Sequence, residues 1–341
     1  MALFSKSLGI DLGTVNVLIY ENGQIVLQEP SLVALAAEED ARGNINVLEI
    51  GQPAREMMGR VFDEEIQVVR PLQNGVIADY EVAEAMLRYY MNKVAGRLRL
   101  FKPVVMISVP YGANNVEKRA VRDAALTAGA REAYLIYEPL AAAIGCGLPV
   151  GTPAGDMVIN IGGGVTEAAV ISMNNIVRAD SGRIGGLRLD EGIMSYIRRK
   201  YNLVIGQLTA ESVKIQIGAA THQTNELSME IQGIDNVSGL PRTINISTGE
   251  VVEALEQPLD MIAQVVKNVL SNTPPELASD IMDRGIMLTG GGALLRGIDQ
   301  YLTNKTNVPC YRAENPMIAV AVGAGRALED PALFRRIATQ S

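Results

Sequence analysis

The sequence predicts an α/β protein built from two related domains. A segment made of an apolar run, a glycine turn and a second apolar run occurs twice, at Leu8–Tyr20 and at Met157–Ile171. Through the first half of the chain, apolar runs of strand length alternate with segments of helical periodicity, which is typical of a sheet layered with helices. Two similar hairpins about 150 residues apart indicate a duplicated domain that clamps one ligand between its halves.

The elements expected before the domain boundary follow from apolar periodicity and from capping residues. They are strands over residues 8–20 and 23–35, a helix over Tyr80–Val94, a strand over Val104–Val109, a helix capped by Asn114 or Asn115 and ending at Gly129, a strand over Ala133–Tyr137 and a helix over Pro139–Gly145. The segment Val150–Gly155, rich in proline and glycine, offers the best domain boundary.

The same criteria predict the elements that follow the second hairpin. They are helices over Leu189–Lys200 and Leu208–Ala220, the second opened by Thr209 and Glu211, a small antiparallel piece within residues 228–250, an amphipathic helix over Pro258–Leu270, a helical pattern over Ala293–Leu302, and a helix over Pro316–Leu328 that returns to the first domain.

The glycine turns are the strongest candidate site. The second hairpin has Asn160 followed by Gly162–Gly164 at its tip, and the first has Asp11 and Gly13 at the matching places. Because glycine has no Cβ, such turns leave backbone N–H groups uncovered, and these can wrap an anion such as phosphate. A third turn, Gly290–Gly292, precedes a helical pattern and suits the other end of the same ligand. Most glycine turns are only turns, so the prediction depends on the recurrence.

Composition excludes several classes of protein. Charged residues make up 20% of the chain and hydrophobic residues 48%, which indicates a globular protein. The net charge of −8 and the absence of tryptophan argue against a nucleic-acid surface. Cys146 and Cys310 have neither metal spacing nor a disulfide framework, so we expect reduced thiols in a cytosolic protein. No apolar run approaches the length of a membrane span, and the N-terminus is too short for a signal peptide.

Five segments together carry a resemblance to a known family. They are GIDLGT at Gly9–Thr14, YEPLAAAI at Tyr137–Ile144, IGGG at Ile161–Gly164, GRIGG at Gly182–Gly186 and LTGGGALL at Leu288–Leu295. In this order and at this spacing, the chain resembles the actin/Hsp70/sugar-kinase superfamily and, within it, the MreB family of bacterial actins. The resemblance covers nearly the whole chain.

The resemblance implies a duplicated, actin-like (ribonuclease H-like) α/β fold, with two domains around a nucleotide cleft. Domain I would comprise residues 1–150 and 316–341, with an inserted subdomain at about 33–75. Domain II would comprise residues 151–315, with an inserted subdomain at about 188–251.

The ligand implied by the resemblance is ATP or ADP with Mg²⁺. Asp11 would hold the Mg²⁺ through water, which suits an ion that dehydrates reluctantly; an Asx turn that only shapes the hairpin is the alternative. Glu211 and Lys214 match the segment that holds ribose and adenine, although an ion pair within one helix is the alternative. The residues implied around the phosphates are Gly13, Thr14, Asn16, Gly162, Gly163 and Gly164, and those implied on the far side of the nucleoside are Gly290, Gly291 and Gly292.

The resemblance leaves the rate of hydrolysis open. Glu138 matches the glutamate that orients or deprotonates the attacking water in that family, and it would also stabilise a helix N-terminus. The family usually carries Asp-Ile-Gly-Gly-Gly-Thr-Thr, where this chain has Asn160 and Val165 in place of the aspartate and the first threonine. Asn160 would make only a weak metal contact, and Val165 removes a hydroxyl proposed to assist the water. The catalytic candidates that the resemblance implies are Glu138 and Thr166. If the protein is an enzyme, we expect a slow ATPase coupled to polymerisation.

A short stretch predicts contact with a membrane. Arg97–Pro103 interleaves Leu98, Leu100 and Phe101 with basic side chains, which suits an anionic bilayer surface. The resemblance implies a membrane-inserting loop at this place. The alternative is a buried loop edge whose basic side chains reach out to water.

The resulting hypothesis is an ATP-binding, actin-like cytoskeletal protein of the cytoplasm. It would polymerise into filaments on the inner face of the cell membrane and maintain rod shape by guiding cell-wall synthesis. Its partners would be further copies of itself, the membrane and cell-wall elongation proteins, with no nucleic acid. The alternatives are a small-molecule kinase or other monomeric ATPase of the same fold, and a chaperone or pilus-assembly ATPase. A kinase would need a catalytic carboxylate facing a substrate cleft and usually a longer chain, and we find no such extra insertion.

Overall fold

The computed structural model describes residues 6–38, 45–61, 64–95 and 102–338. The contacts among them divide the chain into two units. Unit 1 comprises Met1–Pro153, Ile171–Val177 and Met317–Ser341, and unit 2 comprises Ala154–Val170 and Arg178–Pro316. No helix of the described residues is both long enough and apolar enough to cross a membrane.

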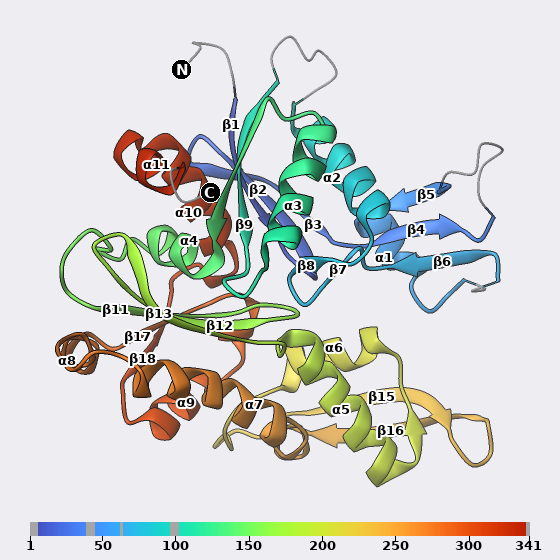
Figure 1. The fold of residues 1–341 in the computed structure, drawn as a ribbon. Coiled ribbons are helices and arrows are strands. Elements are labelled where there is room, and N and C mark those ends of the chain that lie inside the picture. The colour runs from blue at the N-terminus through green and yellow to red at the C-terminus, as the bar shows by residue number, and fades with distance from the viewer. Residues whose placement is uncertain (1–5, 39–44, 62–63, 96–101, 339–341) are drawn as a thin grey trace. The chain divides into compact units, whose positions relative to one another are not determined.

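Unit 1 is built on a five-stranded sheet in the order β10-β9-β1-β2-β3 (Figure 1). Its strands are β1 (Ser7–Leu12), β2 (Asn16–Glu21), β3 (Gln24–Pro30), β9 (Val104–Val109) and β10 (Glu132–Tyr137). β1, β9 and β10 run parallel, whereas β1, β2 and β3 form an antiparallel meander. The carboxyl ends of β1, β9 and β10 therefore meet at one edge of the sheet, where ligands commonly bind in open α/β sheets.

Helices cover both faces of this sheet. They are α2 (Tyr80–Ala95), α3 (Asn115–Thr127), α4 (Glu138–Gly145), α10 (Ala319–Glu329) and α11 (Pro331–Ala338), whereas α1 (Gln52–Met57) packs on smaller strands of the same unit. Leu8 and Ile10 of β1 share one apolar cluster with Met86 of α2 and Val121 of α3. The intervening Gly9 points to the opposite face and meets the backbone of α10. This alternation is what a strand covered on both faces requires.

Smaller strands complete unit 1. They are β4 (Val33–Ala36), β5 (Val47–Ile50) and β6 (Ile66–Val69), which form a sheet in the order β5-β4-β6, and the short pair β7 (Leu72–Gln73) and β8 (Val76–Ile77).

The second large sheet repeats the strand order of the first. Its order is β18-β17-β11-β12-β13, with β11 (Asp156–Ile161), β12 (Thr166–Ser172), β13 (Asn175–Gly182), β17 (Ile286–Thr289) and β18 (Cys310–Arg312). β11, β17 and β18 run parallel, as β1, β9 and β10 do in the first sheet. The duplication inferred from the two hairpins therefore extends to the whole sheet.

The remaining elements lie between β13 and α10 in the chain. They are α5 (Gly186–Tyr201), β14 (Leu203–Val204), α6 (Gln207–Ile217), β15 (Ser228–Asp235), β16 (Pro241–Ser247), α7 (Thr248–Ser271), α8 (Pro275–Arg284), the 3₁₀ turn η1 (Gly291–Leu294), α9 (Ile298–Thr306) and the 3₁₀ turn η2 (Pro316–Ile318). β14, β15 and β16 form a small sheet in that order.

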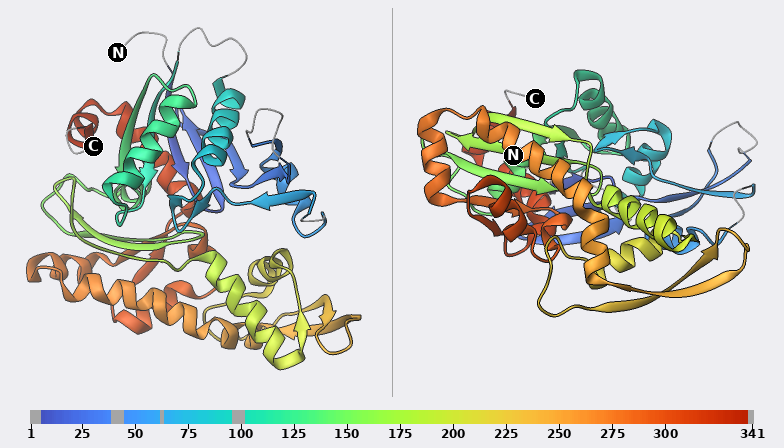
Figure 2. Two further views of the ribbon diagram at one scale, coloured as in Figure 1. Left: turned by 45° about the vertical axis from the view of Figure 1, so that its right-hand side comes forward. Right: turned by 90° about the horizontal axis from the view of Figure 1, so that it is seen from below.

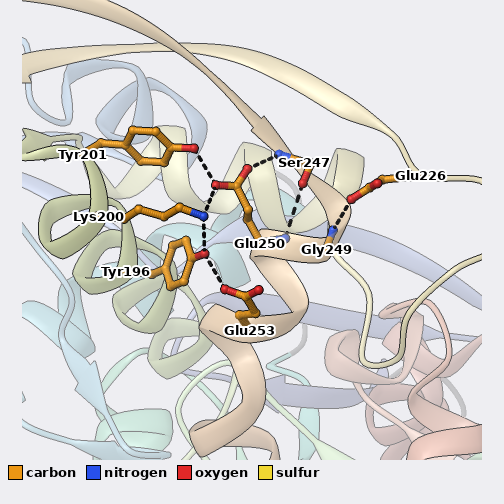
Figure 3. A network of polar contacts seen from close by, with 8 residues as sticks. All are labelled: Tyr196, Lys200, Tyr201, Glu226, Ser247, Gly249, Glu250 and Glu253. Carbon is orange, nitrogen blue, oxygen red and sulfur yellow. Dashed lines mark hydrogen bonds and ion pairs between the residues drawn. The ribbon is translucent and has the colours of Figure 1, made fainter.

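Helices α5 and α7 pack side by side (Figure 2). At the C-terminal end of α5, the Lys200 ammonium lies 2.8 Å from the Glu250 carboxylate, and the Tyr201 hydroxyl donates to the same carboxylate at 2.5 Å (Figure 3). One turn earlier, the Tyr196 hydroxyl donates to Glu253 at 2.6 Å. Glu250 also completes the capping box of α7, so one carboxylate both starts α7 and ties it to α5.

Several helix boundaries differ from those that the sequence predicts, and three of them have a clear local cause. The helix predicted to start at Pro258 starts at Thr248, because Ser247 opens it with a capping box and the proline is tolerated inside it. The helical pattern over residues 293–302 is broken at Gly297, whose φ of +72° is left-handed and separates η1 from α9. α6 starts after Gly206, so Thr209 and Glu211 lie within its first turns and do not cap it.

Helices α4 and α10 of unit 1 contact each other through glycines. A Cβ at Gly323 would lie 1.7 Å from the carbonyl oxygen of Ala141, and a Cβ at Gly145 would lie 1.9 Å from that of Ala319. The two backbones therefore approach more closely than any side chain permits.

We expect Gly323→Ala to destabilise the protein by about 1–3 kcal/mol or more, because the new methyl group would collide with a backbone oxygen that cannot move aside. The free energy of unfolding in urea measures the effect. Gly206→Ala is the control, since nothing lies within 4 Å of its Cβ position and its φ is −78°; we expect it to cost less than about 1 kcal/mol. Equal stabilities of the two variants would contradict the close contact of the helices.

Candidate functional site

The first glycine hairpin joins β1 to β2 in unit 1. The Gly13 amide donates to the carbonyl of Asn16 at 3.1 Å, which closes the tip. A Cβ at Gly13 would lie 2.7 Å from that same carbonyl oxygen, so this position accepts only glycine. Thr14 is buried, and its hydroxyl oxygen accepts from the Gly75 amide at 2.8 Å. The Ser31 hydroxyl donates to the Gly13 carbonyl at 2.5 Å. Hydrogen bonds from Ser31 and Gly75 thus hold the tip in place.

Asp11 lies near the carboxyl end of β1, beside the matching end of β9. Register places it next to Ser108, because Ile10 pairs with Ile107. The Ser108 hydroxyl donates to the Asp11 carboxylate at 3.0 Å. Burial raises the pKa of Asp11 to about 6, and the hydroxyl of Ser108 opposes part of that rise. The protein therefore desolvates this carboxylate without supplying a full charge to compensate it.

The second glycine hairpin joins β11 to β12 in the same way. The Gly162 amide donates to the carbonyl of Val165 at 2.8 Å, three residues ahead, as Gly13 does to Asn16. Asn160 occupies the place of Asp11 and is buried. The Thr289 hydroxyl lies 3.1 Å from the Ile159 carbonyl oxygen and 3.3 Å from the Asn160 side-chain oxygen, so these two acceptors share its single proton. This second tip reproduces the geometry of the first with a neutral side chain at the key position.

Thr166 begins β12 and is fully buried. Its hydroxyl donates to the carbonyl of Ile184 at 2.8 Å. A catalytic role for this hydroxyl would require it to leave that bond.

The third glycine turn, at residues 290–292, follows β17 and lies against the end of β11. Asn160 and Thr289 are register partners across the two strands. A Cβ at Gly290 would lie 2.4 Å from the Ile161 carbonyl oxygen, and a Cβ at Gly292 would lie 2.2 Å from the side chain of Ile161. Gly291, between them, has open space around it. Unit 2 therefore brings the second and third glycine turns together around the end of one strand.

Glu138 and the helix α6 carry the remaining predicted residues. Glu138 is the first residue of α4 in unit 1 and is 8% exposed. In unit 2, the Lys214 ammonium lies 2.7 Å from the carboxylate of Asp190 and donates to the Gly186 carbonyl at 2.9 Å. Lys214 shares α6 with Glu211 but bonds to two residues of α5.

The residues of unit 1 suit a magnesium ion held largely by water. Among the described residues, no group of three or more His, Cys, Asp or Glu side chains could enclose a metal ion. Mg²⁺ usually keeps several waters and takes only one or two carboxylates besides substrate phosphates. A single desolvated carboxylate, Asp11, beside a glycine tip fits that mode.

Sequence reasoning missed three of the residues that shape the site. Ser108 is the one hydroxyl in the apolar strand Val104–Val109, and a lone polar residue there was the available signal. Asp190 lies on the buried face of α5, near Ile193 and Ile197, where a carboxylate is unexpected. Thr289 ends the strand before the third glycine turn. The predicted membrane residues Leu98, Leu100 and Phe101 lie outside the part of the chain that the structure describes.

The sequence matches one family of proteins along nearly its whole length. The family model described as MreB/Mbl protein matches residues 5–336. The cell shape-determining protein MreB of Escherichia coli K12 is 47% identical over 329 residues, which cover 96% of this chain and 94% of that protein. The cell shape-determining protein Mbl of Bacillus cereus is 46% identical over 329 residues, which cover 96% of this chain and 97% of that protein.

Solved structures share the fold. MreB5 of Spiroplasma citri bound to AMPPNP superimposes with a TM-score of 0.90 at 36% identity, over 99% of each chain. The same protein bound to ADP gives a TM-score of 0.88 at 38% identity, over 95% of this chain and 96% of that one. A MamK double helical filament gives 0.80 at 23% identity, over 96% and 99%. The predicted two-domain, actin-like α/β fold is thereby confirmed.

We expect Asp11→Asn to stabilise the ligand-free protein at about pH 7 by up to roughly 3 kcal/mol, the free energy equivalent of a pKa raised from 3.8 to about 6. A carboxyl group whose folded pKa exceeds its unfolded pKa destabilises the fold increasingly as the pH rises through that window. The gain should therefore be mostly absent near pH 4. Urea unfolding in EDTA at both pH values measures it.

The control for this variant is Asp123→Asn, which removes an exposed carboxylate from α3 in the same unit. It should leave the stability nearly unchanged at both pH values. If Asp11→Asn did not raise the free energy of unfolding at neutral pH, the ionised Asp11 carboxylate would not destabilise the fold.

Proposed function

The chain belongs to the MreB/Mbl protein family and is an actin-like cytoskeletal protein of cell shape, and on that premise we propose that it binds ATP or ADP with Mg²⁺ and polymerises. Its relatives from Escherichia coli and Bacillus cereus are cell shape-determining proteins, and MreB5 of Spiroplasma citri has been solved with ADP and with AMPPNP. The observation that carries the proposal is the repeated tip: in each unit a glycine amide bonds to the carbonyl three residues ahead.

The glycine tips support phosphate binding for a physical reason. Turns without Cβ atoms expose consecutive N–H dipoles, and an anion gains hydrogen bonds there without a steric penalty. Gly13, Thr14 and Asn16 form one tip and Gly162–Gly164 the other. Asp11 would hold Mg²⁺ through water, and the ion would neutralise charge on the phosphates. Gly290–Gly292, together with Glu211, would serve the nucleoside.

The proposed slow hydrolysis rests on the residues that the resemblance assigns to the attack of water. Glu138 would orient or deprotonate the attacking water, since it is the candidate carboxylate near the end of β10. The resemblance implies that the place of Asn160 faces the metal's water shell, where this neutral side chain would add no negative charge. Val165 supplies no hydroxyl, and that of Thr166 is bonded to Ile184. We therefore expect the protein to bind the nucleotide and to hydrolyse it slowly.

The small-molecule kinase is not favoured as an alternative. The curated relatives that match 96% of this chain are cell shape-determining proteins. The chain also spans at least 94% of each of these relatives, so little of either lies outside the match.

Membrane association is a proposal that rests on the sequence of residues 97–103. Inserting Leu100 and Phe101 would contribute about 1.5–3 kcal/mol each, and their sum of roughly 3–6 kcal/mol corresponds to a dissociation constant near millimolar. A monomer would hardly stay bound, whereas a filament with many copies would, through effective concentration. The filament would then lie on the inner face of the cytoplasmic membrane, where cell-wall elongation proteins could dock.

High-speed sedimentation with negative-stain imaging tests the function. We expect pelleted filaments when Mg-ATP is present, more of them with anionic liposomes, and slow release of phosphate. The variant Asp11→Ala should remove the dependence on Mg-ATP. Absence of polymer under every condition would overturn the filament proposal, and phosphorylation of added sugars would favour the kinase.

We expect Asn160→Asp to raise the rate of phosphate release, because it restores a negative charge near the metal's water shell. The Thr289 hydroxyl can donate to the new carboxylate as it does to the amide, so the fold should persist. Single-turnover phosphate release at saturating Mg-ATP measures the change. Thr289→Val is the matched control, since it removes the hydroxyl and adds no charge. An unchanged rate in Asn160→Asp would exclude the missing charge as the cause of slow hydrolysis.

A further inference from the structure

Lys214 forms a buried ion pair that reaches from α6 to the start of α5. Its ammonium lies 2.7 Å from the carboxylate of Asp190, whose side chain is 2% exposed, while that of Lys214 is 17% exposed. The same ammonium donates to the Gly186 carbonyl at 2.9 Å. Gly186 is the first residue of α5, so the lysine bonds to the N-terminal turn of that helix.

The start of α5 in turn bonds to the second glycine tip. The Gly186 amide donates to the Gly162 carbonyl at 2.9 Å, and the Leu187 amide donates to the Gly163 carbonyl at 2.9 Å. A Cβ at Gly185 would lie 2.5 Å from the Gly162 carbonyl oxygen, so the two segments are in backbone contact. Moving the start of α5 therefore moves the tip.

These two bonds fix the direction of the amides that the tip offers to a ligand. In a trans peptide the N–H points opposite to the C=O of the same unit. Because the carbonyls of Gly162 and Gly163 point to α5, the N–H groups of Gly163 and Gly164 point away from it. Among the described residues, no backbone carbonyl outside a regular element accepts from either amide. Both stay available for an anion.

The ion pair has no evident purpose in stabilising α5 itself. The Lys214 ammonium opposes the dipole of α5 at its N-terminal turn, and the Asp190 carboxylate beside it offsets that effect, so the pair as a whole gains little from the dipole. Replacing a buried ion pair by apolar groups is often neutral or stabilising. A pair kept at this position therefore suggests a role in holding the geometry of the tip.

We propose that Lys214 and Asp190 are positioning residues, which hold the Gly163 and Gly164 amides in the direction that phosphate binding needs. This inference rests on the proposed nucleotide function and assigns Lys214 an action on the phosphates through α5. The resemblance implies instead that Lys214 helps to hold ribose and adenine. The two assignments differ in a measurable way, because only the phosphate assignment makes the effect depend on how many phosphates the ligand carries.

The test is the double variant Asp190→Asn/Lys214→Met, which removes both charges and so leaves no unpaired ion in the interior. Affinities for ATP, ADP and AMP are measured by competition against a fluorescent ATP analogue, with Mg²⁺ in excess and protein below its polymerisation threshold. We expect ATP affinity to fall about tenfold, the loss of one hydrogen bond to a charged group. ADP should lose less, and AMP should stay within about twofold.

Lys200→Met is the matched control. It breaks the ion pair between Lys200 and Glu250 at the other end of the same helix (Figure 3). It should leave all three affinities unchanged. A graded loss in this variant as well would overturn the proposal, because any loosening of α5 would then suffice.

Other outcomes are equally decisive. A uniform loss for ATP, ADP and AMP in the double variant would show that Lys214 contacts the nucleoside and would overturn the proposal. Unchanged affinities with a lower melting temperature would show a purely structural pair and would also overturn it. If the double variant does not fold, Lys214→Arg takes its place. Its guanidinium keeps the ion pair but cannot reproduce the point contact with Gly186, so a smaller loss in the same order is expected.

The proposed function fails in a distinguishable way. If the unaltered protein bound none of the three nucleotides, the nucleotide function and this inference would fall together. If the unaltered protein binds ATP but the double variant does not lose more affinity for ligands with more phosphates, only the inference about Lys214 and Asp190 is wrong.

Discussion

The close backbone turns at the two glycine tips are the constraint on which the rest of the structure depends. At Gly13 and at Gly162, the space that a Cβ would need is occupied by a carbonyl oxygen three residues ahead. That same oxygen accepts from the glycine amide and closes the turn. A tip of this kind makes few contacts of its own, so the surrounding elements must hold it. The strand order, which is the same in both large sheets, places one such tip at the carboxyl end of a central parallel strand each time.

The carboxylates of Asp190 and Asp11 have different surroundings, which suit them to different roles. Asp190 is buried beside the Lys214 ammonium, so its charge is compensated within the protein. Asp11 is desolvated beside a hydroxyl, that of Ser108, and its pKa rises to about 6. The first arrangement suits a fixed support and the second a site whose missing positive charge comes from a ligand. The protein thus bears a cost in stability at Asp11, as functional sites commonly do.

The second tip has the shape of the first but carries a neutral side chain. The resemblance implies an aspartate at the place of Asn160, whose side-chain oxygen lies 3.3 Å from the Thr289 hydroxyl. The hairpin closes with the same bond as the first one. Shape serves the binding of phosphate, whereas charge near the metal serves the attack of water. The proposed slow hydrolysis rests on this difference between shape and charge.

The sequence by itself determined the duplication, the glycine tips, most strands and helices, and the family, because these depend on local periodicity, on turn chemistry and on the order of short motifs. Only the tertiary structure decided what depends on neighbours distant in the chain. Register across two strands put Ser108 beside Asp11, and helix packing put Lys214 against Asp190 and Gly186. The glycine contact of α4 and α10 is of the same kind. A side chain's partner is set by which backbones lie side by side, and one-dimensional patterns do not carry that information.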